Sequence, residues 1–155
     1  TRGSGWGPPT VLVQSAGQGF WAPLLALSGY LACPPEEKAI DPGSLLEAGR
    51  RMRFRLLANP TVTRNRKRYG LAGEEEQLGW LARQGERHGF QVQAAVVTAR
   101  DLLNSHKDGR PLIIQRVLFD GYLEVTDPGA LGQALVSGIG PAKAFGCGLL
   151  SVARA

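Results

Sequence analysis

The sequence has few of the residues on which many catalytic and structural sites depend. Its 155 residues include only two cysteines, Cys33 and Cys147, and two histidines, His88 and His106. The cysteines are far apart and lie in apolar surroundings, so we expect two buried free thiols in a reducing compartment rather than a disulfide. No Cys/His spacing resembles a zinc site, and the carboxylates are too scattered for a two-metal site. We therefore expect neither a metal nor a cofactor.

Long hydrophobic runs are also missing. The longest, residues 20–32, is interrupted by Pro23 and Gly29 and is too short to span a bilayer. No basic and apolar leader stands at the start, so nothing indicates export. These features predict a cytoplasmic protein without a membrane partner.

Acidic residues are absent from one window, Arg50 to Tyr69, which holds eight of the eighteen lysines and arginines. The whole chain carries a net charge of +5. A concentrated basic patch suits a polyanion, nucleic acid first, although a solvated basic edge has the same composition. The charge pattern favours nucleic acid without deciding between these two interpretations.

From residue 51 onward, the hydrophobic pattern predicts six elements in the order β-α-β-β-α-β. They are a strand at 51–60, a helix at 74–89, strands at 90–99 and 112–125, a helix at 127–138 and a strand at 148–153. A basic loop is expected at 61–70 and a bulge at Gly121. This order predicts a ferredoxin-like α+β fold, an antiparallel sheet with two helices on one face.

The first part of the chain is harder to interpret. Residues 10–15 are rich in β-formers and predict a strand, and residues 20–31 predict a helix. The proline-rich stretch that follows is expected to be a connection with a short strand at 37–41. We place a domain boundary near residues 42–49.

The element order from residue 51 underlies many RNA-binding modules, but one of their signatures is missing. The aromatic motif that stacks bases on the sheet is absent, so base stacking there is not expected. The chain ends instead in a glycine-rich stretch with one lysine, Lys143; its glycines are Gly138, Gly140, Gly146 and Gly148. They match neither a Walker loop nor a dinucleotide fingerprint, which disfavours a nucleotide-binding module. Close approach to a phosphate and tight packing both remain open.

Three stretches closely resemble one family. They are "FRLLANP" (54–60), "QRVLFDGYLEV" (115–125) and "GIGPAKAFGCGLLSVA" (138–153). They resemble the CasE family, the CRISPR type I-E repeat-processing endoribonucleases, and the similarity runs from about Pro8 onward. The resemblance implies tandem ferredoxin-like domains and metal-independent cleavage of the CRISPR repeat RNA hairpin. It also implies that the chain stays with other subunits in an RNA-guided antiviral surveillance complex.

One departure from the family matters. Family members begin with a strand, a helix that carries the catalytic histidine, and a second strand, and this chain starts after them. The resemblance therefore implies that 1–42 is the trailing half of the first domain, 43–49 a linker and 50–155 the complete second domain. Neither His88 nor His106 matches the catalytic histidine, so the catalytic residues are unknown. We expect this chain alone to bind RNA without cutting it; a non-catalytic hairpin-binding subunit is the alternative.

The residues expected to contact RNA are cations in four segments. They are Arg66, Lys67 and Arg68 in the basic loop, Arg100, Lys107 and Arg110 around a hairpin, Arg116 on a strand, and Lys143 in the glycine-rich stretch. Arg116 is equally able to pair with a neighbouring acid. By analogy with the family, the four glycines bring backbone and Lys143 close to the RNA.

Overall fold

The computed structural model describes residues 10–15, 17–41, 43, 46–107 and 109–155, and the side chains at 105–107, 110 and 111 lie outside this description. The chain divides into two compact units, Thr1–Ile40 and Asp41–Ala155. In the described part, no helix is long and apolar enough to cross a membrane.

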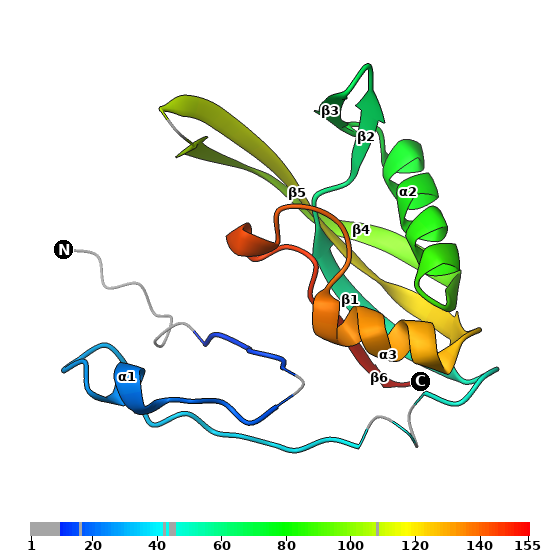
Figure 1. Ribbon diagram of the computed structural model, residues 1–155. Helices are drawn as coiled ribbons and strands as arrows, with labels where there is room; N and C mark the ends of the chain where they lie inside the picture. Colours follow the sequence, from blue (N-terminus) through cyan, green and yellow to red (C-terminus); the bar gives the residue numbers. More distant parts are fainter. Residues whose placement is uncertain (1–9, 16, 42, 44–45, 108) are drawn as a thin grey trace. The chain divides into compact units, whose positions relative to one another are not determined.

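The second unit is built on a four-stranded antiparallel sheet (Figure 1). Its strands are β1 (Arg51–Ala58), β4 (Phe90–Lys107), β5 (Arg110–Val125) and β6 (Leu150–Arg154), in the order β4-β5-β1-β6. Helix α2 (Glu74–Arg87) follows β1, and α3 (Pro128–Ser137) follows β5. Leaving aside the small β2–β3 hairpin, this is the β-α-β-β-α-β order of a ferredoxin-like fold, so the predicted α+β class is confirmed.

Strand β1 has the alternation that the sequence predicts. Met52, Phe54 and Leu56 are buried, whereas the arginines between them are exposed. Trp80 of α2 and Leu131 of α3 belong to the same core cluster, so both helices cover the apolar face of the sheet. Within the second unit, no described helix covers the opposite face, which carries the arginines of β1.

The two helices begin and end where local chemistry predicts. Three glutamates fill the first turn of α2, and Gly89 follows its end with a φ of 75°. In α3, the Asp127 carboxylate accepts hydrogen bonds from the N–H groups of Gly129 and Ala130, at 2.9 and 3.1 Å. These bonds satisfy donors that a helix start otherwise leaves unpaired.

The predicted bulge at Gly121 of β5 is wrong, because the bulges lie on the neighbouring strand β4. The register shifts lie on β4, between Val92 and Ala94 and between Val97 and Ala99. Gly121 faces this bulged strand, and a Cβ there would lie 2.0 Å from the carbonyl oxygen of Ala94. The glycine therefore permits the close approach of β4.

The predicted basic loop at 61–70 is a hairpin. Strands β2 (Thr61–Arg64) and β3 (Lys67–Gly70) pair in a separate two-stranded sheet. Asn65 and Arg66 join them with φ values of 50° and 60°. Two consecutive left-handed residues make the two-residue turn that suits the twist of a hairpin, and asparagine tolerates that conformation well.

The first unit has less regular structure than predicted. In its described residues, the strands expected at 10–15 and 37–41 do not form, and the helix is the single turn α1 (Ala22–Leu25). A strand needs a partner to satisfy its backbone, and no described strand lies in this unit. Cys33 is exposed, contrary to the prediction, whereas Cys147 is buried; both are free.

Candidate nucleic-acid interface

The glycine-rich stretch forms a closed loop after α3. The N–H of Ile139 donates to the carbonyl of Gly148 at 2.8 Å, and the N–H of Gly148 donates to the carbonyl of Leu57 at 2.7 Å. These two bonds hold the ends of the loop together and fasten it to β1. All four glycines have φ values between 74° and 96°, a region that other residues rarely adopt.

Three of the four glycines also have close neighbours where a side chain would begin. A Cβ at Gly140 would lie 2.9 Å from the Trp80 ring, and a Cβ at Gly148 would lie 2.8 Å from the Ile139 carbonyl oxygen. A Cβ at Gly138 would lie 3.1 Å from the Gly148 carbonyl oxygen, whereas Gly146 faces open space. Tight packing therefore explains Gly138, Gly140 and Gly148.

Lys143 lies at the tip of this loop, in the short 3-10 helix η1 (Lys143–Phe145), and is exposed. Its Cγ lies 3.3 Å from the position of a Cβ at Gly148, and its Cδ lies 3.6 Å from that at Gly138. The alkyl stem therefore uses the space that the two glycines leave open. Close packing and presentation of a cation are two results of the same arrangement.

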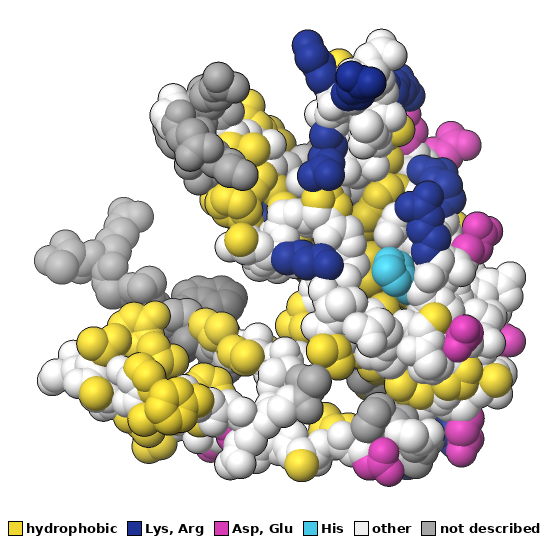
Figure 2. Space-filling view, viewed as in Figure 1, with side chains coloured by type: hydrophobic (Ala, Val, Ile, Leu, Met, Phe, Trp, Pro, Cys, Tyr) yellow, Lys and Arg dark blue, Asp and Glu magenta, His cyan; other side chains and the backbone are white. Residues whose placement is uncertain are grey.

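Lys143 acts electrostatically on the end of α2. His88, the partly buried residue that caps α2, has a pKa below its usual value because burial disfavours the charged imidazolium, and because Lys143 and Arg87 repel it. In Figure 2 a histidine lies beside dark blue lysine and arginine side chains. The loop and the C-terminal end of α2 thus contribute to one cationic surface.

Replacing Lys143 with alanine should raise the pKa of His88, since one of the two repelling cations is removed. The value should stay below that of a free histidine, because burial is the larger cause and remains. A proton NMR titration of the imidazole measures both values. An unchanged pKa of His88 in Lys143→Ala would contradict the electrostatic effect of Lys143 on His88.

The lowered pKa of His88 also affects stability. The free energy of unfolding should fall as pH drops through about 6.5, because the unfolded chain takes up a proton first.

The β2–β3 hairpin presents the densest group of cations. Arg64, Arg66, Lys67 and Arg68 are all exposed there, and Figure 2 shows dark blue side chains over the hairpin. Among the described residues, none of these four forms an ion pair. The charges of these four side chains are therefore available to an external polyanion.

Two other residues that were predicted to contact RNA, Arg100 and Arg116, form ion pairs within the protein. Arg100 on β4 contacts Glu74 of α2 at 2.5 Å and donates to the Gln77 side-chain oxygen at 3.1 Å. Arg116 on β5 forms two hydrogen bonds with Asp101 of β4, at 2.7 and 2.5 Å, which hold the pKa of Asp101 below its usual value. Of the two roles that the sequence allowed for Arg116, contact with RNA or pairing with a neighbouring acid, the structure shows the second.

The remaining predicted contacts lie at the end of the β4–β5 hairpin. Lys107 and Arg110 are paired in the register of the two strands. Their side chains, like that of His106, lie outside the described residues. In the part of the chain that is described, no group of three or more His, Cys, Asp or Glu side chains could hold a metal ion.

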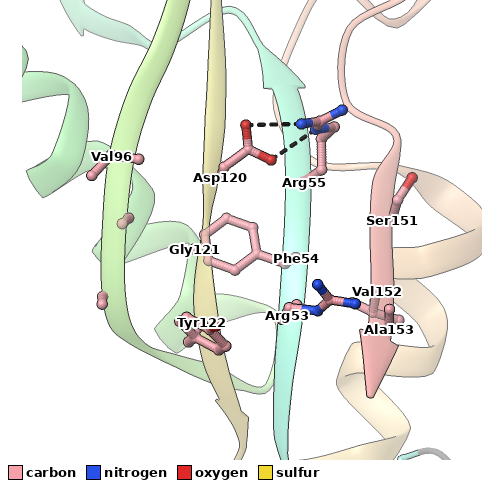
Figure 3. Close-up of a pocket in the computed structure, with 12 residues that line it drawn as sticks. Arg53, Phe54, Arg55, Val96, Asp120, Gly121, Tyr122, Ser151, Val152 and Ala153 are labelled. Carbon is pink, nitrogen blue, oxygen red and sulfur yellow. Dashed lines mark hydrogen bonds and ion pairs between the residues drawn. The ribbon is translucent and has the colours of Figure 1, made fainter. Parts of the chain in front are cut away.

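The face of the sheet away from the helices carries further charged and aromatic side chains, which were not predicted to contact RNA (Figure 3). Arg53 and Arg55 line a hollow there, with Asp120 and Tyr122 on the neighbouring strand. Arg55 bonds to Asp120 at 2.7 and 3.3 Å, which lowers the pKa of that carboxyl. The alternation of β1 predicts the exposed arginines, but only the register of β5 places Tyr122 beside them.

Comparison with known proteins gives one consistent result. Residues 2–154 match the family described as CRISPR associated protein. The CRISPR-associated endoribonuclease Cse3 of Thermus thermophilus is 38% identical over 160 residues, covering 94% of this chain and 74% of that protein. The CRISPR system Cascade subunit CasE of Escherichia coli is 37% identical over 121 residues, covering 70% of this chain and 60% of that protein.

Solved structures agree. A structure of Cse3 bound to a 19-nucleotide RNA has a TM-score of 0.70 and 37% identity, covering 76% of this chain and 61% of that one. The crystal structure of Cas6e from Escherichia coli has a TM-score of 0.62 and 32% identity, covering 77% and 66%. The chain thus spans about three fifths of several relatives that it matches. It belongs to the family of CRISPR-associated proteins, as the resemblance of its three sequence stretches predicts.

Proposed function

We propose that this chain binds the hairpin of CRISPR repeat RNA through the cations of its second unit. The observation that carries the proposal is the β2–β3 hairpin, whose exposed lysine and arginines have no ion pair among the described residues. Helical RNA presents dense phosphates and a shallow groove, so charge and shape govern its recognition. The RNA-bound Cse3 structure supports RNA as the polyanion.

Lys143 is the second proposed contact with RNA, after the β2–β3 hairpin. Its position at the tip of the glycine-rich loop offers a compact charge with three donors to a phosphate. We keep Lys107 and Arg110 as further proposed contacts, because they end the two strands of an extended hairpin. Arg100 and Arg116 are weaker candidates, since contact with RNA would compete with their bonds to Glu74 and Asp101.

We further propose that the chain acts in endoribonucleolytic processing of CRISPR RNA and works within a surveillance complex. Two relatives are named endoribonuclease Cse3 and Cascade subunit CasE, and a solved CRISPR RNA-guided surveillance complex contains a chain with a TM-score of 0.62 and 30% identity. Cleavage needs a general base, a general acid and cations near the phosphate. The described residues offer the cations; a non-catalytic RNA-binding subunit remains the alternative.

Binding of repeat-hairpin RNA should weaken steeply as salt rises. Each phosphate neutralised by a lysine or arginine should add about −0.7 to −0.9 to the slope of log affinity against log salt concentration. Fluorescence anisotropy with labelled repeat RNA between about 50 and 200 mM salt measures this slope. An affinity that does not change with salt would refute binding through the cationic surface.

The same samples test catalysis by this polypeptide. Incubated with repeat RNA and EDTA, the 155-residue chain should leave the RNA intact on a denaturing gel. Neither His88, which caps α2, nor His106 matches the catalytic histidine of the family, so neither is expected to act as the general base. Specific cutting at the hairpin base that Ala substitution of His88 or His106 abolishes would show the opposite.

A further inference from the structure

The open face of the four-stranded sheet contains a hollow on the side away from the helices. The residues that line it come from all four strands of the sheet (Figure 3). Its lining side chains include Arg53 of β1, Val96 of β4, Tyr122 of β5 and Ser151 of β6. Gly121 and Ala153, which have no side chain or a single methyl group, also line it and leave room above the strands.

The charge in this hollow is concentrated at Arg53. The charge of its neighbour Arg55 is balanced by Asp120, which also accepts a hydrogen bond from the Thr98 hydroxyl at 2.8 Å. Arg53 forms no ion pair with any residue that the structure describes. Figure 3 shows its guanidinium directed toward β6, over the hollow. An anionic group bound there would meet a cation that forms no ion pair with a described acidic residue.

Flat and apolar surfaces lie beside this cation. Tyr122 is 37% exposed, and the Arg51 guanidinium lies 4.6 Å from the centre of its ring. Val96, on the next strand, is 58% exposed. Aromatic rings and guanidinium planes are the surfaces on which unpaired bases stack. The hollow thus combines a site for a flat apolar group with a site for an anion.

We propose that this hollow binds single-stranded RNA, with a phosphate at Arg53 and an unpaired base against the Tyr122 and Arg51 pair. A base in a duplex is already stacked, so the hollow suits unpaired nucleotides rather than the helical stem. The sequence did not predict base stacking on the sheet, because the usual aromatic motif is absent. The register supplies one ring and one free cation instead. The proposal shares with the proposed function only the assumption that the ligand is RNA.

Fluorescence anisotropy with a labelled, unstructured oligouridine tests this site. Tyr122→Ala should weaken binding about tenfold, as expected from the loss of one stacked base, and Arg53→Gln about fivefold. Tyr122→Phe should bind like the unchanged chain, because it keeps the ring. Arg83→Gln, which removes the same charge from α2 outside the hollow, should have less than a twofold effect on this oligonucleotide.

A blunt repeat hairpin without single-stranded flanks separates this proposal from the proposed function. Its affinity should change less than twofold in Tyr122→Ala and Arg53→Gln. If the hairpin does not bind the unchanged chain while the oligouridine does, the proposed function fails and the proposed single-strand site in the hollow is retained.

The inference is overturned if the unchanged chain does not bind oligouridine, which would leave the hollow for a protein partner. It is also overturned if both variants bind oligouridine normally. Equal losses for both RNAs would also overturn a separate single-strand site. Thermal melts check folding, and Arg53→Gln provides the test if Tyr122→Ala unfolds.

Discussion

Removing the three charges at the turn of the β2–β3 hairpin should weaken binding of repeat-hairpin RNA by about a hundredfold near 0.1 M salt. The variant is Arg66→Asn, Lys67→Gln and Arg68→Gln. Each lost phosphate contact removes the release of nearly one counterion, which at this salt concentration corresponds to somewhat less than tenfold in affinity. Asparagine is chosen at position 66 because the φ of 60° there disfavours most other residues. Fluorescence anisotropy at several salt concentrations measures both the affinity and its salt slope.

A charge-preserving variant is the control for this experiment. Lys67→Arg with Arg68→Lys keeps both cations on β3 and should bind within about threefold of the unchanged chain, because phosphates are recognised here mainly as charges. Thermal melts of both variants should match the unchanged chain, since exposed cations without ion pairs contribute little to stability. A loss below threefold in the charge-removed variant, with an unchanged salt slope, would exclude the hairpin as an RNA contact.

The features that the sequence predicted well are those that depend on local pattern. Alternation of apolar and basic residues predicts β1 and its two faces, and the acidic first turn and Asp127 predict the starts of both helices. The β2–β3 hairpin was missed because its strands are short and its turn, Asn65-Arg66, has no glycine. In the sequence alone, a short basic stretch without an apolar face cannot be distinguished from a loop.

The features that were missed at the candidate interface depend on distant pairing. Arg100 meets Glu74, 26 positions away, and Arg116 meets Asp101, 15 positions away. No local spacing shows that these two cations are paired with acids, whereas those at residues 64–68 form no ion pair with a described residue. Likewise, the sequence does not show that Tyr122 lies beside Arg53. Only the pairing register of β1 and β5 places the two residues opposite each other. The sequence therefore predicts how basic the domain is, but not which of its charges are available.

The glycine-rich loop had two interpretations, phosphate contact and tight packing, and the structure supports packing for most of its glycines. Gly140 and Gly148 each have a neighbour that leaves no room for a side chain, and Gly138 has one in tight contact. This does not make the loop irrelevant to RNA, because the same packing fixes the place of Lys143. The stability of the loop and the affinity for RNA should then respond to different substitutions.

Gly148→Ala should destabilise the second unit by about 3 kcal/mol, whereas Gly146→Ala should cost only about 1 kcal/mol. Both positions have a left-handed φ, 96° and 78°, so both variants carry the backbone penalty of an alanine there. Only at Gly148 does the new Cβ meet backbone, the Ile139 carbonyl oxygen at 2.8 Å, next to the hydrogen bond that closes the loop. At about 4–8 °C per kcal/mol for a domain somewhat smaller than this unit, the midpoints of thermal melts should differ by roughly 10 °C. Equal melting temperatures would mean that the loop relaxes around the added methyl group, and that packing does not explain Gly148. If Gly146→Ala melts nearly normally but binds repeat RNA more weakly than the unchanged chain, the open side of the loop is itself an RNA contact.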